Sequence, residues 1–492
     1  MSQIDVQNLT FGYDGGYTNV FENVTFRIDT DWKLGLVGRN GRGKTTFLNL
    51  LAGRYEYTGK IFSAVKFSYF PFEVKNNERL AYDIVSEICP DAEDWEIICE
   101  LSRLSVDAEV LYRPFKTLSN GERTKLLLAA LFLNEGNFLL IDEPTNHLDE
   151  EGRKKVAEYL NAKKGFILVS HDRAFLDGCV DHILSINRTD IEVHSGNFSV
   201  FTENFQKRQA FENTQNEKLK KEISRLSEAA ARTAGWAEKT EASKFGKCDS
   251  GLKPDRGYVG HKAAKMMKRA TVAAARKNAA AESKKALLKN VETAEKLKIF
   301  PLEYHSERLL YLENVEIVYG GKKVCAPVSF ELKKGERIAL KGRNGCGKSS
   351  ILKLISGEDV PHTGSAVLAS GLKISYVPQS TENMKGRLAD FAREQGVDVG
   401  FFMMLLDKTG FEKKHFDGDI SSFSEGQKKK VLLAKSLCEK AHVYVWDEPL
   451  NYIDVYSRVQ IENLLSEYKP TMIFVEHDSA FRTAVATREV EL

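Results

Sequence analysis

Runs of hydrophobic residues that suit buried strands recur near both ends of the chain, and segments with helical spacing separate them. The runs are 34–37, 138–141 and 166–169 in the first part, and 338–340, 443–446 and 472–475 in the last part. Such short, nearly continuous runs are typical of strands that are covered on both faces. Helical patterns begin soon after the first run of each set, at Phe47 and at Ile351. The pattern predicts α/β domains at both ends.

A different pattern occupies residues 206–300, which are rich in Ala, Lys, Glu and Leu and therefore favour helix. One cluster of helix-breaking residues, five glycines and prolines between 246 and 260, interrupts it. We predict two helices, 205–244 and 261–298, each about 60 Å long at 1.5 Å per residue. Hydrophobic positions such as Ile223 and Leu288 suit the seam of an antiparallel hairpin.

Charge distinguishes this middle segment from the rest of the chain. Residues 206–300 contain 23 Lys and Arg against 11 Asp and Glu, a balance of +12, whereas the whole chain carries +2. An excess of one sign along a helix is typical of a surface that meets phosphate backbones. A pair of helices that the charge merely keeps solvated is the alternative. The excess is greatest at Lys262, Lys265, Lys268, Arg269, Arg276 and Lys277.

Composition narrows the class of protein. A chain of 492 residues with 42% hydrophobic content can bury two or three cores. Its longest hydrophobic run, 126–133, is far shorter than the ~18 residues of a membrane span. The first residues lack the basic and apolar regions of an export signal, and the 7 cysteines form no C-x-x-C pair. We therefore expect a cytoplasmic protein with no membrane domain in the chain.

The chain contains an internal repeat. Two segments fit G-x-x-x-x-G-K-[ST], the pattern of a loop whose backbone N–H groups surround nucleotide phosphates. Other matching landmarks, among them Glu143 with Glu448, keep nearly the same spacing, which indicates a duplicated domain. The predicted nucleotide-binding residues of these loops are Gly38, Asn40, Gly41, Gly43, Lys44, Thr45, Thr46, Gly342, Asn344, Gly345, Gly347, Lys348, Ser349 and Ser350. We place the domain boundaries at 1–205, 206–300 and 301–492, with the loop tip of the middle segment at 245–260.

Carboxylates follow a buried strand in each copy. Asp142 and Asp447 are predicted to reach a Mg²⁺ ion that Thr45 and Ser349 also bind. The next residues, Glu143 and Glu448, are predicted to accept a proton from the attacking water. Asp-Glu-Pro could instead simply end a strand, but both copies continue as Pro-x-Asn-x-x-Asp.

Two further pairs repeat at matching positions. His171 and His477 each follow a buried strand, and we expect them to contact the γ-phosphate, although a lone histidine is more often structural. Tyr13 and Tyr319 precede the loops by similar distances and are predicted to stack on adenine, with core packing as the rival interpretation.

A Ser-x-Gly motif opens a predicted helix in each copy, where helix N-termini attract anions. The residues are Ser119 with Gly121 and Ser424 with Gly426. If the domains face each other head to tail, each motif would complete the phosphate loop of the other domain. ATP would then hold the two domains together, and hydrolysis would release them.

These motifs, in this order, resemble the ATP-binding cassette proteins over nearly the whole chain. Two cassettes in one chain, the sequence at 142–149 and a basic linker resemble the F subfamily, whose members act on the ribosome. The phrases at 31–35, 265–269 and 446–451 are similar to its antibiotic-resistance branch. The resemblance implies two P-loop cassette domains of α/β fold joined by a long antiparallel helical hairpin. It also implies ATP and Mg²⁺ as cofactors, with Gln379 as a further metal ligand.

The same resemblance implies a biological role. Such proteins enter the exit site of the bacterial ribosome when closed on ATP, and the hairpin contacts peptidyl-site transfer RNA on the large subunit. The protein would act as a monomer and protect against lincosamides, streptogramin A and pleuromutilins. A housekeeping translation factor of the subfamily is the alternative, and the ATPase subunit of a drug exporter is a lesser one. The residues expected to contact RNA are Lys247, Lys253, Arg256, Tyr258, Lys262, Lys265, Lys268 and Arg269.

The sequence departs from the family pattern in the first cassette. Phe72 stands where the second cassette has Gln379, so it cannot bind a metal ion. Asn120 and Glu122 replace the more common glycine and glutamine of the signature. The first site would therefore hydrolyse ATP slowly or use water in place of that ligand, and the sequence leaves open whether the two sites turn over equally. No inserted arm fits between Phe72 and Leu118, which favours the resistance role over the housekeeping one.

Overall fold

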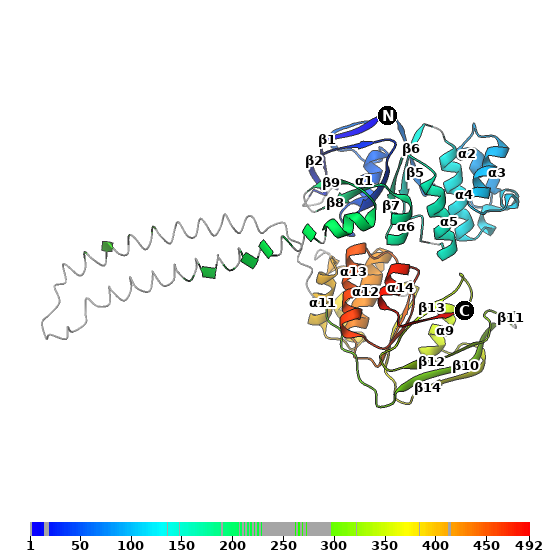
Figure 1. Ribbon diagram of the computed structural model, residues 1–492, viewed down its shortest axis with the longest axis vertical. Helices are drawn as coiled ribbons and strands as arrows, with labels where there is room; N and C mark the ends of the chain where they lie inside the picture. The colour runs from blue at the N-terminus through cyan, green and yellow to red at the C-terminus, as the bar shows by residue number, and fades with distance from the viewer. Residues whose placement is uncertain are drawn as a thin grey trace. The chain divides into compact units, whose positions relative to one another are not determined.

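The structure is a computed structural model that describes most of the chain outside the middle segment (Figure 1). The described residues are 2–13, 19–134, 136–146, 148–187, 190–205, 297–320, 322–382, 384–411 and 415–492, with single or paired positions between 207 and 272. Contacts divide the chain into two compact units, one of Met1–Phe201 with Ala294–Leu492 and one of Thr202–Thr293. The first unit thus contains both copies of the repeat, which we call the N-terminal and C-terminal halves.

The N-terminal half contains two sheets. An antiparallel sheet has the order β2-β1-β4, and a larger sheet has the order β5-β6-β7-β3-β8-β9, with parallel pairing except between β8 and β9. The strands are β1 (Gln3–Phe11), β2 (Phe21–Asp29), β3 (Lys33–Val37), β4 (Thr58–Phe62), β5 (Lys66–Phe70), β6 (Asn137–Asp142), β7 (Phe166–Val169), β8 (His182–Ile186) and β9 (Ile191–Ser195).

Helix α1 (Lys44–Leu51) packs in a hydrophobic core with strands of both sheets. Its residues Phe47 and Leu48 share that core with Ile4 of β1 and Leu36 of β3, so the helix after the phosphate loop is fixed from two sides. The remaining helices of this half are α2 (Ala81–Ile88), α3 (Asp94–Arg103), α4 (Asn120–Leu133), α5 (Glu150–Asn161) and α6 (Arg173–Cys179), with the 3₁₀ turns η1 (Ala108–Tyr112) and η2 (Phe115–Thr117).

The C-terminal half repeats this plan. A parallel sheet has the order β15-β16-β17-β13-β18, and β10 pairs antiparallel with β11, β12 and β14. Its strands are β10 (Arg308–Tyr319), β11 (Lys322–Lys323), β12 (Val328–Lys333), β13 (Arg337–Lys341), β14 (His362–Leu368), β15 (Ile374–Val377), β16 (Val443–Asp447), β17 (Met472–Val475) and β18 (Arg488–Glu491). Its helices are α9 (Lys348–Ile355), α10 (Leu388–Glu394), α11 (Val399–Lys408), α12 (Glu425–Cys438), α13 (Val455–Tyr468) and α14 (Ser479–Val485), with the turn η6 (Ile420–Ser422).

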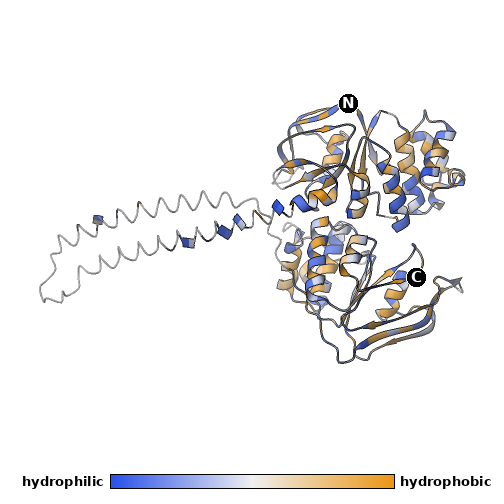
Figure 2. Ribbon diagram, viewed as in Figure 1, coloured by the Kyte–Doolittle hydropathy of each residue, from blue (hydrophilic) through white to orange (hydrophobic). Residues whose placement is uncertain are grey.

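Alternation along β16 shows why its run of hydrophobic residues is continuous. Val443 and Val445 belong to the core that contains α9, whereas Tyr444 and Trp446 belong to the core that contains α12. Both faces of the strand are therefore buried, and the hydrophobic residues gather in the strands and the helix faces beside them (Figure 2). The α/β prediction is confirmed for both halves.

The predicted hairpin of the middle segment falls mostly on residues that the structure does not describe. This holds for the loop tip at 245–260 and for most positions of the two predicted helices. Among the described residues, no helix is both long enough and apolar enough to cross a membrane.

Candidate functional site

Each phosphate loop joins an inner strand of the parallel sheet of its half to a helix. Lys44 begins α1 after β3, and Lys348 begins α9 after β13. The Lys44 ammonium donates to the Gly38 carbonyl at 2.8 Å and to the Asn40 side-chain oxygen at 3.1 Å. The Lys348 ammonium donates to the Gly342 and Arg343 carbonyls, both at 2.8 Å. Both lysines thus turn back over their own loops, into the place where phosphate oxygens would replace these carbonyls.

Glycine is required at the last loop position for a conformational reason. Gly43 and Gly347 have φ angles of 89° and 92°, the left-handed region that favours glycine. A Cβ atom on Gly43 would also lie 2.6 Å from Val20 Cγ1. The loop can therefore turn into the helix only without a side chain at this position.

The two strand-ending aspartates have different surroundings. Asp142 Oδ2 accepts hydrogen bonds from the hydroxyl groups of Thr45 at 2.9 Å and of Tyr69 at 3.0 Å. Asp447 is buried, and neither of its carboxylate oxygens has a hydrogen bond in the described structure. Burial raises the pKa of Asp447 to about 6, although the Ser349 hydroxyl nearby opposes this rise. A buried carboxylate without donors fits a cation site, because a metal ion would supply the missing partner.

The glutamates that follow share a backbone strain. Glu143 and Glu448 have φ angles of 51° and 47°, which non-glycine residues rarely adopt, and both backbone N–H groups donate to the neighbouring strand, to Val169 and Val475. Such strain is maintained only where the surrounding structure imposes it, and it is frequent at active sites. The strain turns each glutamate away from the direction of its strand.

The side chains of these glutamates differ in their hydrogen bonds. Glu448 accepts from His477 at 3.2 Å, from Gln379 at 2.9 Å and from Asn451 at 2.7 Å. Glu143 Oε1 lies 3.2 Å from His171 Nε2, but the contact lacks hydrogen-bonding geometry, so this oxygen is unpaired among the described residues.

The different surroundings of Glu143 and Glu448 give their side chains different pKa values. Burial, followed by the Asp142 charge, raises the pKa of Glu143 to about 8. Burial opposes ionisation of Glu448 as well, but the hydrogen bond and charge of His477 and the hydrogen bond of Gln379 outweigh it and lower the pKa of Glu448 to about 2. The two groups therefore differ in protonation near neutral pH.

The tyrosines beside the loops present exposed rings. The Tyr13 hydroxyl is 2.7 Å from the Thr46 hydroxyl, and the Tyr319 hydroxyl donates to Ser350 at 3.1 Å. Nearly half of each side chain is exposed, while the Tyr13 ring also packs edge-on against Phe11 and Tyr55. A flat ring held at the edge of the phosphate loop offers a surface for a nucleobase.

The Ser-x-Gly motifs begin helices, as the sequence predicts. Ser119 accepts from the Glu122 backbone and Ser424 from the Gln427 backbone, and the side chains of Glu122 and Gln427 bond back to the serine N–H groups. Each serine is therefore the N-cap of a 14-residue helix, α4 or α12, in a capping box.

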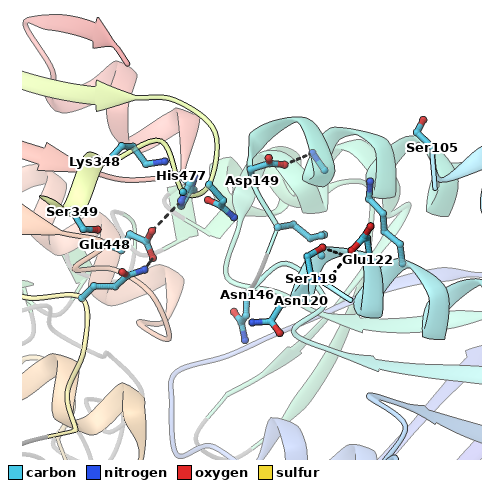
Figure 3. Close-up of a pocket in the computed structure, with 18 of the residues that line it drawn as sticks. Ser105, Ser119, Asn120, Glu122, Asn146, Asp149, Lys348, Ser349, Glu448 and His477 are labelled. Carbon is cyan, nitrogen blue, oxygen red and sulfur yellow. Dashed lines mark hydrogen bonds and ion pairs between the residues drawn. The ribbon is translucent and has the colours of Figure 1, made fainter. Parts of the chain in front are cut away.

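One cavity brings motifs of both halves together (Figure 3). It has a volume of about 810 Å³, and its wall includes Lys348, Ser349 and Glu448 from the C-terminal half with Ser119 and Asn146 from the N-terminal half. In the opposite pairing, the Asn40 side chain donates to the Tyr452 carbonyl at 2.7 Å, and a Cβ atom on Gly426 would lie 3.6 Å from Asn40 Nδ2. The structure thus brings each phosphate loop to the other half's motif, as head-to-tail pairing requires.

The sequence matches a known family in both halves. The profile described as ABC transporter matches residues 21–146 and 325–451, together more than half of the chain. The chain belongs to the ABC transporter family. It has two cassettes, binds ATP and is an ATPase.

Several relatives are similar over nearly the whole chain. The ribosome protection protein VmlR of Bacillus subtilis is 28% identical over 94% of this chain and 82% of its own length. The ABC transporter ATP-binding protein YfmM of the same organism is 27% identical over 99% of this chain and 98% of its length. The probable ATP-binding protein YheS of Escherichia coli is 28% identical over 94% and 75%. These relatives include members of the F subfamily.

Solved structures share the fold. The archaeal recycling factor aABCE1, solved in complex with the ribosomal stalk protein aP1, superposes with a TM-score of 0.64 at 19% identity, over 98% of this chain and 87% of that one. The structure titled RNase-L Inhibitor gives 0.63 at 18% identity, over 99% and 87%. At such identities the likeness establishes the tandem-cassette fold.

Two groups of residues stand apart from the sequence predictions. Of the residues expected to contact RNA, only Lys265 and Lys268 are described, and the other six lie outside the described residues. Conversely, Tyr69, Asn451 and the contact between Gln379 and Glu448 were not predicted. Tyr69 and Tyr376 stand three positions before Phe72 and Gln379, and this matching spacing is the feature of the sequence that could have pointed to the two tyrosines.

Proposed function

We propose that this protein is an F-subfamily ATPase that binds the bacterial ribosome and protects it from drugs that act at the peptidyl-transferase centre. The likeness to VmlR, which is named a ribosome protection protein and matches 94% of this chain, carries the proposal. The charge of +12 in residues 206–300 supports it, because a cationic segment of this length suits a partner made of RNA. The drug classes are lincosamides, streptogramin A and pleuromutilins, and the site of action is cytoplasmic.

In this proposal the ATP chemistry runs at two composite sites. Glu143 and Glu448 accept the proton of the attacking water, and His171 and His477 contact the γ-phosphate. Lys44 and Lys348 hold the β- and γ-phosphates, while Tyr13 and Tyr319 stack on the bases. Ser119 with Gly121 and Ser424 with Gly426 close on the nucleotide from the opposite cassette. The contacts of Glu448 with His477 and Gln379 support this assignment most directly at the second site.

Mg²⁺ would neutralise charge between the β- and γ-phosphates. Thr45 and Asp142 would hold it at the first site, and Ser349, Asp447 and Gln379 at the second. The unpaired, buried carboxylate of Asp447 and the hydroxyl of Thr45 beside Asp142 support these positions.

The closed form would be the form that acts. The proposed organisation is a first cassette at 1–205, a basic hairpin at 206–300 and a second cassette at 301–492, in a monomer. ATP bridges the cassettes, and the hairpin reaches peptidyl-site transfer RNA on the large subunit. Hydrolysis separates the cassettes and releases the ribosome.

Co-sedimentation with ribosomes tests the partner. The variant with both Glu143→Gln and Glu448→Gln should accumulate on bacterial ribosomes with ATP, because closure is retained while hydrolysis stops. A matched control, the double variant Lys44→Ala and Lys348→Ala, should remain in the supernatant. Failure of the first variant to bind would refute the ribosomal role.

Growth inhibition tests the drug classes. A sensitive strain that expresses the protein should become resistant to lincomycin, tiamulin and virginiamycin M, but not to erythromycin. The ribosome-trapping variant should give no such resistance. An unchanged drug profile, together with ribosome binding, would favour the second candidate.

That candidate is a general translation factor of the same subfamily. The relatives YfmM and YheS match 99% and 94% of this chain, as extensively as VmlR does, and their names give ATP binding alone, so the likeness by itself does not separate the two candidates. Ribosome profiling in drug-free cells with and without the gene separates the two, since a general factor should change ribosome positions without any drug.

A further inference from the structure

Tyr69 of β5 and Tyr376 of β15 are each the second residue from the end of their strand, at matching positions in the two cassettes, but they make different contacts. The Tyr69 hydroxyl donates to Asp142 Oδ2 at 3.0 Å. The Tyr376 hydroxyl is buried and has no hydrogen-bond partner in the described structure. A tyrosine therefore hydrogen-bonds to the strand-ending aspartate in the first cassette, and the corresponding tyrosine of the second cassette does not.

A cation fixes the ring of Tyr69. The Arg54 guanidinium lies 4.4 Å from the centroid of the Tyr69 ring, and Arg54 also donates to the Asn49 side chain at 3.1 Å. The matching position in the second cassette is Glu358, which cannot make a cation–π contact. The first cassette thus differs from the second both in the cation–π contact of Arg54 with Tyr69 and in the hydrogen bond from Tyr69 to Asp142.

The first cassette lacks the glutamine that the second cassette has at position 379, and the hydrogen bond from Tyr69 to Asp142 lies in the cassette without it. Phe72 cannot bind a metal ion, whereas Gln379 supplies an amide that donates to Glu448 at 2.9 Å in the second cassette. Asp142 Oδ2 accepts from both Thr45 and Tyr69, and two donors on one oxygen restrict rotation of the carboxylate.

We propose that Tyr69, held by Arg54, is a positioning residue for the metal ion of the first ATP site. It orients Asp142 where the first cassette lacks the glutamine of the second. The second site does not depend on Tyr376 in this way. The proposal concerns the ATPase itself, so it stands or falls independently of the ribosomal role.

Metal affinity measured one site at a time tests the proposal. The first site is isolated in a Lys348→Ala background and the second in a Lys44→Ala background, and Mn²⁺ is titrated by electron paramagnetic resonance with a non-hydrolysable ATP analogue. Tyr69→Phe should weaken Mn²⁺ at the first site by about 10-fold, since it removes one hydrogen bond to a charged group. The matched change Tyr376→Phe should weaken Mn²⁺ at the second site by less than about 2-fold.

Two controls separate positioning from structure. Analogue binding in EDTA and the thermal midpoint should not change in Tyr69→Phe. Adding Phe72→Gln to Tyr69→Phe should restore Mn²⁺ affinity to within about 3-fold of the parent, because the amide oxygen is a metal ligand. Arg54→Glu, which copies the second cassette, should weaken Mn²⁺ in the same direction while leaving the hydroxyl in place.

Three results would overturn the proposal. They are an unchanged Mn²⁺ affinity in Tyr69→Phe, equal losses in Tyr69→Phe and Tyr376→Phe, and a loss in Tyr69→Phe that persists after Phe72→Gln is added. A fall in thermal midpoint that accounts for the lost affinity would assign Tyr69 a structural role and would overturn it as well.

Discussion

The two ATP sites of this chain share their motifs and differ in what surrounds them. Glu448 accepts hydrogen bonds from His477, Gln379 and Asn451, whereas Glu143 Oε1 has none among the described residues. Near pH 7 the first glutamate, with its pKa raised to about 8, holds a proton that the second, with its pKa lowered to about 2, has lost. A general base must be ionised to act, so if these glutamates are the bases, as proposed, the second site should hydrolyse ATP faster than the first.

A sequence motif supplies the reacting groups but does not set their protonation. Both glutamates directly follow a buried strand, have positive φ angles and lie beside a histidine. Several contacts make the difference. His477 hydrogen-bonds to Glu448 whereas Glu143 Oε1 has no such bond, and Gln379 donates to Glu448 where the first cassette has Phe72, which cannot hydrogen-bond to a carboxylate. A duplicated domain can thus keep two binding sites while it concentrates hydrolysis in one.

Removing each glutamate should give the largest contrast. Glu448→Gln should lower steady-state ATP turnover by about 100-fold or more, within the range that a general base contributes. Glu143→Gln should lower it by no more than about 2-fold, because its site contributes little. Phosphate release from the purified single variants measures both. Equal losses would mean that the sites are equivalent.

The pH dependence should follow the two acidities. In the Glu448→Gln background only Glu143 acts, and the fraction of a base with a pKa of about 8 that is ionised rises with pH. The residual rate should therefore increase about 50-fold between pH 6 and pH 8. In the Glu143→Gln background the rate should stay nearly constant over this range, since Glu448 is ionised throughout. Parallel profiles in the two backgrounds would contradict the assignment.

Exchanging the residues at the critical position should narrow the contrast. Gln379→Phe removes a donor from Glu448 and should lower turnover by about 10-fold, the effect of one hydrogen bond to a charged group. Phe72→Gln should raise the residual rate of the Glu448→Gln variant by a similar factor. Phe72→Leu serves as the control. It keeps an apolar side chain, so it should change neither the turnover of the otherwise unchanged protein nor the residual rate of the Glu448→Gln variant.

Much of the fold and of the candidate site could be predicted from the sequence, and the features that could not be predicted have a physical cause. The continuous run at 443–446 predicted a buried strand, and β16 is covered on both faces. The loop glycines and the capping serines are required by the local backbone conformation, so they stand in short motifs that both copies of the repeat contain. The Tyr69 contact with Asp142 joins β5 to β6 across 73 positions, and it depends on how two strands pair. No local pattern contains that information.

The capping serines should give the smallest and most equal effects. Ser119→Ala and Ser424→Ala each remove one capping hydrogen bond at the start of a helix. Each should lower the free energy of unfolding by about 1 kcal/mol. Thermal or urea unfolding of the nucleotide-free protein measures the change, and replacement by Asp, which also caps, should restore most of it. A large difference between the two would show that the motifs are structurally unequal too.

The nucleotides that remain on the protein after a single turnover test the inequality of the sites most directly. Wild-type protein loaded with ATP labelled at the α-phosphate is separated rapidly from free nucleotide, and its bound ATP and ADP are counted. We predict one ADP and one ATP per chain, with the ATP lost from the protein when Lys44 is replaced by Ala. Two ADP per chain, formed at the same rate, would contradict the account.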